Sequence, residues 1–325
     1  MDPRRILVVQ LRRIGDVLLS TPAVRALKSR FPQASIHFLV EPPSLEVVRD
    51  RPEIDEVLVY APSNLAETLA WLSRIRSRNY DLVVDFMGNP RTALLAWCSD
   101  APHRAGPAHV FHRWAYNIRL PQSAETVYAA REKIRMLAPL GVPDEPSPLP
   151  AWPRRPDVRA EDLVGLMPAS RKETRRWPAE HYAALGRKLR DELGVKLLVF
   201  WGPGEFELAK QVADAIGKDA SVCEKTASLQ ALAEQILRCK LVVTNCAGPK
   251  HIAVALDVPT LTIHSSSDPK AWTPMTERHR SIRRDELHCI GCRLNECPYH
   301  MECMRDLSPE RVFAAAQSML QGAAA

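Results

Sequence analysis

The chain has 325 residues, of which 46% are apolar and 25% are charged; this length favours two domains, and the composition is that of an ordinary globular protein. No stretch approaches the roughly 18 to 20 consecutive apolar residues that span a membrane, so we expect a cytoplasmic protein. The net charge of +6 fits an anionic substrate, an anionic membrane or merely a solvated basic surface. Nucleic acid is not an expected partner, because no basic run has the pattern of interleaved aromatic residues that would favour it.

The first half of the chain alternates apolar runs with helical periodicity, a pattern typical of βαβ units and parallel sheets. Two arginines precede the first apolar run, as in a signal peptide, but the run is short and no cleavage site follows, so it is interpreted as a strand. The predicted strands are 5–9, 35–40, 57–60 and 82–85, and the predicted helices are 16–30, 65–78, 91–98 and 124–140.

A proline-rich segment, residues 141–157, then interrupts the pattern, and proline excludes both helix and central strand. We therefore divide the chain into a domain at 1–145, a linker at 146–160 and a domain at 161–325. The second block predicts strands at 163–167, 195–200, 241–244 and 260–263, and helices at 178–192, 205–216, 229–237, 249–256 and 308–320. Two such halves predict a cleft between them. Ligands of parallel sheets bind beyond the carboxyl ends of the strands, so the loops that follow the strands are the candidate sites.

The loop after the first strand contains one glycine, Gly15, and therefore lacks the dinucleotide-binding fingerprint. Asp16 follows at the start of a helix, where an acid is either a capping and dipole partner or a cleft-facing general base. Arg12 and Arg13 beside it would keep Asp16 ionised or bind an anionic acceptor.

In the second half, a hydroxyl and three basic side chains precede a helix: Ser170, Arg171, Lys172 and Arg175. A helix N-terminus with basic neighbours is a good diphosphate site, and an exposed basic loop is the alternative. Glu205 follows a Gly-Pro-Gly turn, where it either binds ribose hydroxyls or simply begins a helix.

A third loop begins with the tight Gly248-Pro249 turn, and the helix after it carries His251 in its first turns. A single histidine is more often structural than functional. The next strand ends in a small polar loop, residues 264–268, which includes Asp268 and is suited to line a cleft.

Two further segments each allow more than one functional interpretation. Residues 104–119 are basic and aromatic; an ordinary surface loop is the simpler interpretation, and an acceptor or membrane surface is the other. Four cysteines form a C-x2-C-x4-C-x5-C cluster that fits a structural zinc, with an iron–sulfur cluster, disulfides or free thiols as alternatives. These cysteines are Cys289, Cys292, Cys297 and Cys303.

Six segments occur in an order that resembles glycosyltransferase family 9, the ADP-heptose:lipopolysaccharide heptosyltransferases. They are RILVVQLRRIGDVLLSTPAVRALKSRFP, DFMGNPRTALL, RRWP, FWGPGE, NCAGPKHIA and SSSDPKAWTP. The resemblance implies the GT-B architecture, an α/β fold of two Rossmann-like parallel-sheet domains facing a central cleft, with the acceptor in the N-terminal domain and the nucleotide sugar in the C-terminal one.

The resemblance also implies a reaction and a place for it. A heptose would pass with inversion from ADP-heptose to a lipid A/core-oligosaccharide acceptor, without a catalytic metal, on an enzyme that is peripheral to the inner membrane. Asp16 falls on the family's catalytic aspartate, and Gly15, Arg12 and Arg13 accompany it on the acceptor side. The positions that match the family's donor site are Ser170, Arg171, Arg175, Gly248, His251 and Asp268; Lys172, Glu205 and Pro249 are added from the loop analysis above.

The sequence departs from the family at the Asp-(Ser/Thr)-Gly-x-x-His pattern, where Cys246 and Ala247 replace the acid and the hydroxyl. A neutral thiol cannot accept the charge-assisted hydrogen bonds that the acid is thought to make to the sugar. A glycosyltransferase with a different nucleotide-sugar donor, or a non-catalytic nucleotide-sugar-binding relative, is therefore the alternative function.

Overall fold

The computed structural model describes residues 1–146, 148–153 and 156–322. The chain divides into two compact units, Met1–Arg154 and Arg155–Ala325. This division falls inside the segment 146–160 that we expected to be a linker; residues 147, 154 and 155 of that segment lie outside the described residues. The described residues from 142 to 157 form neither helix nor strand, as the prolines predict.

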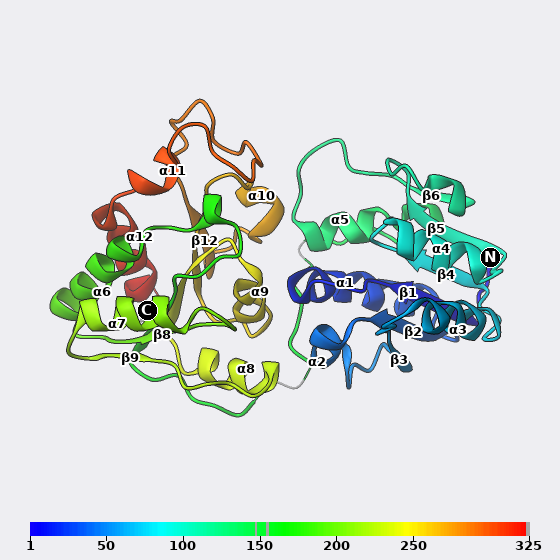
Figure 1. Cartoon of the computed structure of the whole chain (residues 1–325), viewed down its shortest axis with the longest axis horizontal. Helices are drawn as coiled ribbons and strands as arrows, with labels where there is room; N and C mark the ends of the chain where they lie inside the picture. Colours follow the sequence, from blue (N-terminus) through cyan, green and yellow to red (C-terminus); the bar gives the residue numbers. More distant parts are fainter. Residues whose placement is uncertain (147, 154–155, 323–325) are drawn as a thin grey trace. The chain divides into compact units, whose positions relative to one another are not determined.

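The first unit is built on a six-stranded parallel sheet with the order β3-β2-β1-β4-β5-β6 (Figure 1). Its strands are β1 (Arg5–Val9), β2 (Ser35–Val40), β3 (Glu56–Val59), β4 (Leu82–Asp85), β5 (His103–Pro107) and β6 (Ile118–Leu120). Its helices are α1 (Ile14–Arg30), α2 (Leu45–Val48), α3 (Leu65–Arg76), α4 (Pro90–Cys98) and α5 (Ala129–Arg135), with 3-10 turns η1 (Pro42–Ser44), η2 (Arg113–Ala115) and η3 (Ala138–Leu140).

The second unit repeats the plan with a six-stranded parallel sheet of order β12-β11-β10-β7-β8-β9. Its strands are β7 (Leu163–Met167), β8 (Lys196–Val199), β9 (Ala220–Val222), β10 (Leu241–Asn245), β11 (Thr260–Ile263) and β12 (His279–Ile282). Its helices are α6 (Ala179–Leu193), α7 (Phe206–Ile216), α8 (Leu229–Leu237), α9 (Gly248–Ala255), α10 (Pro269–Trp272), α11 (Glu302–Arg305) and α12 (Pro309–Gly322), with the 3-10 turn η4 (Glu173–Arg175).

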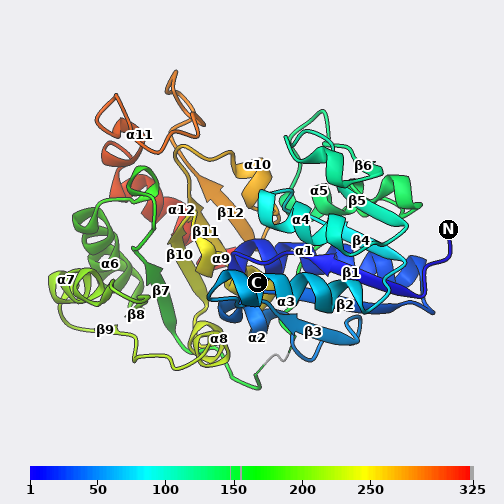
Figure 2. The same ribbon diagram turned by 45° about the vertical axis from the view of Figure 1, so that its right-hand side comes forward.

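Both sheets are buried on two faces, which is why their central strands are continuous apolar runs rather than alternating ones. In the first unit, Ile75 of α3 and Ala93 of α4 pack against Leu7 of β1 on one face, and α1 and α5 pack side by side. In the second unit, α6, α7 and α12 share one core with β7 and β8, and α8 and α9 lie across the sheet from them (Figures 1 and 2).

The strand order places one candidate site in each unit. In each sheet, the first three strands follow one another from the centre to one edge, and the next three strands follow one another from the centre to the other edge. The strand order therefore reverses between β1 and β4 and between β7 and β10. Ligands of open parallel sheets bind at the carboxyl ends of the strands beside such a reversal. The candidate sites are therefore formed by the residues after β1 and β4 and by those after β7 and β10.

The structure corrects three sequence-based predictions. The predicted helix 124–140 is shorter, because α5 covers Ala129–Arg135 and a separate 3-10 turn follows. Residues 104–119 are not simply a surface loop, since they contain most of β5, all of η2 and the start of β6. The short strands β9 and β12 were not predicted at all. Among the described residues, no helix is both long and apolar enough to cross a membrane.

Candidate active site

Asp16 lies in the first turn of α1, directly after the loop that leaves β1. Its Oδ2 atom accepts a hydrogen bond from the backbone N–H of Arg13 at 3.4 Å, the ordinary role of an acid at this position. Within the described residues, Oδ1 accepts no hydrogen bond, and neither Arg12 nor Arg13 forms an ion pair with the half-exposed Asp16. The carboxylate therefore both supports the helix and leaves one oxygen for a reacting group.

The loop before Asp16 is held from behind by two buried or half-buried side chains. Gln10 donates from Nε2 to the carbonyl of Arg12 at 2.7 Å and accepts at Oε1 from Nζ of Lys133 at 2.9 Å. The Lys133 ammonium also lies 4.8 Å from the ring centre of Phe86, which follows β4. Sequence patterns did not point to Lys133, because a lysine on a short helix normally faces solvent.

A second carboxyl group, Asp85, lies at the end of β4 and is fully buried. It accepts hydrogen bonds from the Tyr116 hydroxyl at 2.6 Å and from the backbone N–H groups of Met87 and Gly88 at 2.8 and 3.3 Å. Burial raises the pKa of Asp85, and these hydrogen bonds oppose the rise. Since all these partners belong to the protein, Asp85 supports the fold of this edge.

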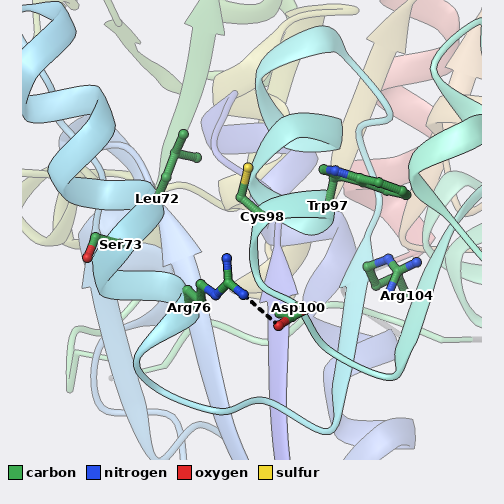
Figure 3. Close-up of a pocket in the computed structure, with 7 residues that line it drawn as sticks. All are labelled: Leu72, Ser73, Arg76, Trp97, Cys98, Asp100 and Arg104. Carbon is green, nitrogen blue, oxygen red and sulfur yellow. Dashed lines mark hydrogen bonds and ion pairs between the residues drawn. The ribbon is translucent and has the colours of Figure 1, made fainter.

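Of two cavities formed by described residues of the first unit, one is at the reactive edge and one is not. A cavity of about 310 Å³ is lined by residues after β2 and β3 and by Arg91 of α4, whose guanidinium pairs with Glu41 at 3.0 Å. Glu41 also donates its backbone N–H to Leu11 O at 2.8 Å, so this cavity adjoins the Asp16 loop. A larger cavity of about 480 Å³ contains Arg76, Trp97 and Asp100 (Figure 3). It lies where strands begin, at the opposite edge, and is not part of the candidate site.

In the second unit, the loop after β7 is fastened to the end of β10 by one amide side chain. Asn245 accepts the backbone N–H of Trp177 at 3.1 Å and donates to the Pro168 carbonyl at 2.8 Å. The loop between them contains the buried Ser170 and the basic residues Arg171, Lys172 and Arg175. The sequence-predicted phosphate loop is therefore a fixed structure at the strand reversal.

Helix α9 begins at the end of β10, beside this loop. Its N-cap is Ala247, whose side chain makes no capping hydrogen bond, so the first amides of the helix are free of the usual side-chain acceptor. Behind them, the fully buried Lys250 donates to Cys246 Sγ at 3.8 Å and to Thr273 Oγ1 at 3.4 Å. Burial lowers the pKa of Lys250.

Several buried polar atoms around this helix have no partner within the described residues. They are Nε of Arg175, Nδ1 of His251 and Oγ of Ser266. Burial, and then the positive charge of Lys250, hold the pKa of His251 well below its usual range, so the ring is neutral. A buried polar group without a partner is costly, so this group of atoms is suited to a polar, anionic ligand.

Two acids predicted to line the site have local roles as well. Glu205 accepts the backbone N–H of Gly202 at 2.9 Å through Oε2, which closes the Gly-Pro-Gly turn. Asp268 is the N-cap of α10 and accepts the N–H of Lys270 at 2.9 Å. Glu205 is the helix-start acid that the sequence allowed, whereas the capping role of Asp268 was not predicted. Each keeps a second oxygen.

A family model described as glycosyltransferase family 9 (heptosyltransferase) matches residues 69–302, well over half of the chain. The chain belongs to this family. It is thus a glycosyltransferase. Lipopolysaccharide heptosyltransferase 2 of Salmonella typhimurium is 25% identical over 97% of this chain and 98% of its own length.

Solved structures agree with this family assignment at the level of the fold. A glycosyltransferase of family 9 from Veillonella parvula superposes with a TM-score of 0.82 and 25% identity, covering 98% of this chain and 97% of its own. ADP-heptose lps heptosyltransferase II of E. coli superposes with a TM-score of 0.77 at 22% identity, covering 99% of this chain and 100% of its own. The two parallel sheets are thus those of a GT-B family 9 enzyme.

The cysteine segment of this family 9 chain packs against the candidate donor loops. The backbone N–H of Gly291 donates to Ser265 O at 3.3 Å, that of Arg293 donates to Ser266 O at 2.8 Å, and Leu294 O accepts from the Thr174 hydroxyl at 3.1 Å. The segment therefore braces the loops after β7 and β11.

The four clustered thiols lie near one another. Burial, followed by the neighbouring Cys297, Cys289 and Cys292, raises the pKa of Cys303 to about 11. Among the described residues, no group of three or more His, Cys, Asp or Glu side chains is arranged to hold a metal ion, and the cysteines are free thiols. A structural zinc at these cysteines stays a prediction.

Proposed function

We propose that this family 9 enzyme transfers a heptose from ADP-heptose to a lipid-linked core sugar, with inversion at the anomeric carbon. The similar proteins are named for lipopolysaccharide heptosyl transfer and for ADP-heptose. One observation carries the proposal for this chain: the two points where the strand order reverses carry groups of opposite polarity. The reversal in the first unit has a carboxylate, that of Asp16. The reversal in the second unit has helix amides without a side-chain cap, together with buried polar atoms that have no partner among the described residues.

On the donor side, the second unit binds the ADP diphosphate. The helix N-terminus at Gly248-Pro249 and the basic loop before α6 supply amides and positive charge. The residues proposed to surround the donor are Ser170, Arg171, Lys172, Arg175, Glu205, Cys246, Gly248, Pro249, His251 and Asp268. Because fixed positive charge stabilises the departing diphosphate, the proposal needs no catalytic metal.

On the acceptor side, the first unit presents a sugar hydroxyl to the free oxygen of Asp16. As the hydroxyl oxygen forms its bond to the anomeric carbon, the bond from that carbon to the diphosphate oxygen breaks, and Asp16 takes the proton. ADP leaves with both electrons of the broken bond. Arg12, Arg13 and Gly15 flank the acceptor, and the Glu41–Arg91 cavity is a suitable place for its remaining sugars.

The substitution Asp16→Asn tests the assignment of the base. We expect transfer from ADP-heptose to a deacylated lipopolysaccharide inner-core acceptor to fall by at least about 100-fold, since positioned general bases contribute this much, while the Kd for ADP is unchanged. Asp214→Asn, which alters an exposed acid paired with Lys210 on α7, serves as the matched control. Wild-type rates in Asp16→Asn would refute Asp16 as the base.

A second candidate is transfer from a different nucleotide sugar, and Cys246 with Lys250 favours it. A thiol stands where the family has an acid, and the buried ammonium of Lys250 lies beside it, so the charge and the length of hydrogen bonds to sugar hydroxyls change. Product formation with a panel of nucleotide sugars separates this candidate from ADP-heptose transfer. Donor binding without any product would indicate a non-catalytic relative instead.

We also propose that the first unit docks on the inner membrane through an aromatic–basic patch, comprising Trp97, Arg104, Phe111, Arg113 and Trp114. Phe111 is 88% exposed, and Trp97 and Trp114 are each more than half exposed, with ring centres 5.5 Å apart. The Arg104 guanidinium lies 5.4 Å from the Trp97 ring centre. Amphipathic rings beside cations suit the headgroup layer of an anionic bilayer.

A further inference from the structure

We propose that Lys133 is a positioning residue for Asp16: through Gln10 it holds the β1–α1 loop in place and presents a positive charge to the carboxylate. This inference rests on the proposed function, since it concerns how the base is held.

The connection from Lys133 to Asp16 runs through three consecutive hydrogen bonds. Nζ of Lys133 donates to Oε1 of Gln10 at 2.9 Å, and Nε2 of Gln10 donates to the Arg12 carbonyl at 2.7 Å. The next backbone N–H, that of Arg13, donates to Oδ2 of Asp16 at 3.4 Å. Because Gln10 is only 3% exposed, water competes little for these bonds. A shift of the ammonium therefore moves the peptide unit that orients Asp16.

The acidic groups that attract Lys133 belong to the candidate site and not to the surface of α5. Asp16 of α1 and Asp85 of β4 both attract the ammonium, although neither lies within ion-pair distance among the described residues. On α5 itself, the neighbouring Arg135 is occupied by Glu125 and Asp144. Glu132, next to Lys133 in sequence, accepts the backbone N–H of Ser123.

The position of Lys133 gives the enzyme a pH dependence. Burial lowers the pKa of Lys133 to about 8, and the attraction of Asp16 and Asp85 opposes this shift. Below that pH the ammonium is charged and holds the loop; above it the neutral amine loses its attraction for Asp16. Transfer should therefore decline as the pH rises through about 8.

The pH profile of kcat/KM for the acceptor tests the inference in the full-length enzyme. Wild type should lose activity above about pH 8, whereas Lys133→Arg, whose guanidinium stays charged, should retain it at pH 9. Lys133→Met should lower kcat about tenfold or more at pH 7, as expected for a displaced base, with no alkaline decline and an unchanged Kd for ADP. Lys210→Met, which removes an exposed lysine from α7, should behave as wild type.

Two further measurements distinguish a failure of the Lys133 inference from a failure of the Asp16 assignment. Gln10→Leu should reproduce the loss of kcat if the connection acts as described. NMR titration of 13C-methylated lysines should show one resonance, missing in Lys133→Met, that titrates near pH 8. A profile in Lys133→Arg that coincides with wild type, or titration of Lys133 above pH 10, overturns the inference. Active Asp16→Asn would instead overturn the proposed base, so the two failures are distinct.

Discussion

At the scale of single residues, Asn245 shows how one side chain fixes a loop. It is fully buried, and both its oxygen and its nitrogen are used, by Trp177 N–H and by the Pro168 carbonyl. A buried amide whose oxygen and nitrogen both form hydrogen bonds stabilises the fold, but its removal leaves two buried backbone groups without partners. The loop that carries Ser170 and Arg175 therefore depends on a residue outside it.

We expect Asn245→Ala to lower the free energy of unfolding by about 1–3 kcal/mol, the cost of leaving buried polar groups unpaired. Urea denaturation followed by tryptophan fluorescence measures this directly. Ser221→Ala, at an exposed hydroxyl of β9, should change stability much less. Equal stabilities for the two variants would contradict the role assigned to Asn245.

Some residues could be recognised from the sequence and others could not. Asp16, Arg175 and His251 follow apolar runs closely in the sequence, and the strand order brings the segments after such runs to one edge of each sheet. Lys133 could not be recognised, because its burial depends on the packing of α5 against α1. From the sequence, Glu205 either binds ribose hydroxyls or begins a helix; its place as the N-cap of α7 and its hydrogen bond to the Gly202 N–H show the second role.

At the scale of elements, the strands that were not predicted share a simple cause. Residues 103–107 read HRAGP, and β9 and β6 have three residues each, so neither apolar runs nor alternation is present. Their strand conformation comes from pairing with a neighbour, as β5 pairs with β4, which local sequence does not reveal. The long buried strands β1 and β7 were predicted because they are continuous apolar runs.

Strand β5 offers a stability test, because Gly106 packs directly under an aromatic ring. A Cβ at this position would lie 2.5 Å from three ring atoms of Tyr116, whose hydroxyl is bound to Asp85. Gly106→Ala should therefore destabilise the protein by about 1–3 kcal/mol through overpacking. Gly322→Ala, where a Cβ meets nothing within 4 Å, is the control. A thermal melt in which both variants match wild type would show that the ring gives way freely.

The cysteine segment carries the next prediction. Four thiols within fifteen residues are expected to bind one zinc ion, and the segment braces the loops after β7 and β11. The double variant Cys289→Ser/Cys292→Ser should lose zinc, measured by elemental analysis, and bind ADP about tenfold more weakly, since the braces loosen. Cys98→Ser, at an isolated thiol of α4, should do neither. A metal-free wild type with full ADP affinity would contradict the prediction.

At the scale of the whole molecule, the net charge of +6 favours anionic surfaces, and the aromatic–basic patch concentrates this attraction. We expect binding to vesicles of anionic phospholipid but not to zwitterionic ones, and release as salt is raised. Arg104→Gln/Arg113→Gln should weaken vesicle binding by about tenfold or more, since each cation contributes about 1 kcal/mol. Co-sedimentation measures the effect.

The control for the membrane prediction is a substitution of an exposed apolar side chain that lies outside the aromatic–basic patch. Met275→Ser changes a residue of the second unit that is 54% exposed, and it should leave vesicle binding as in wild type. Phe111→Ser/Trp114→Ser should reduce it, because the rings no longer enter the headgroup layer. Unaltered binding in both the arginine and the aromatic double variants would mean that another surface meets the bilayer.

Each sheet is built only from strands of its own unit, in the same order of strands. Mutations in one half therefore need no compensating change in the hydrogen-bond ladder of the other. Hybrids that join the first half of one family member to the second half of another should therefore keep both cores intact.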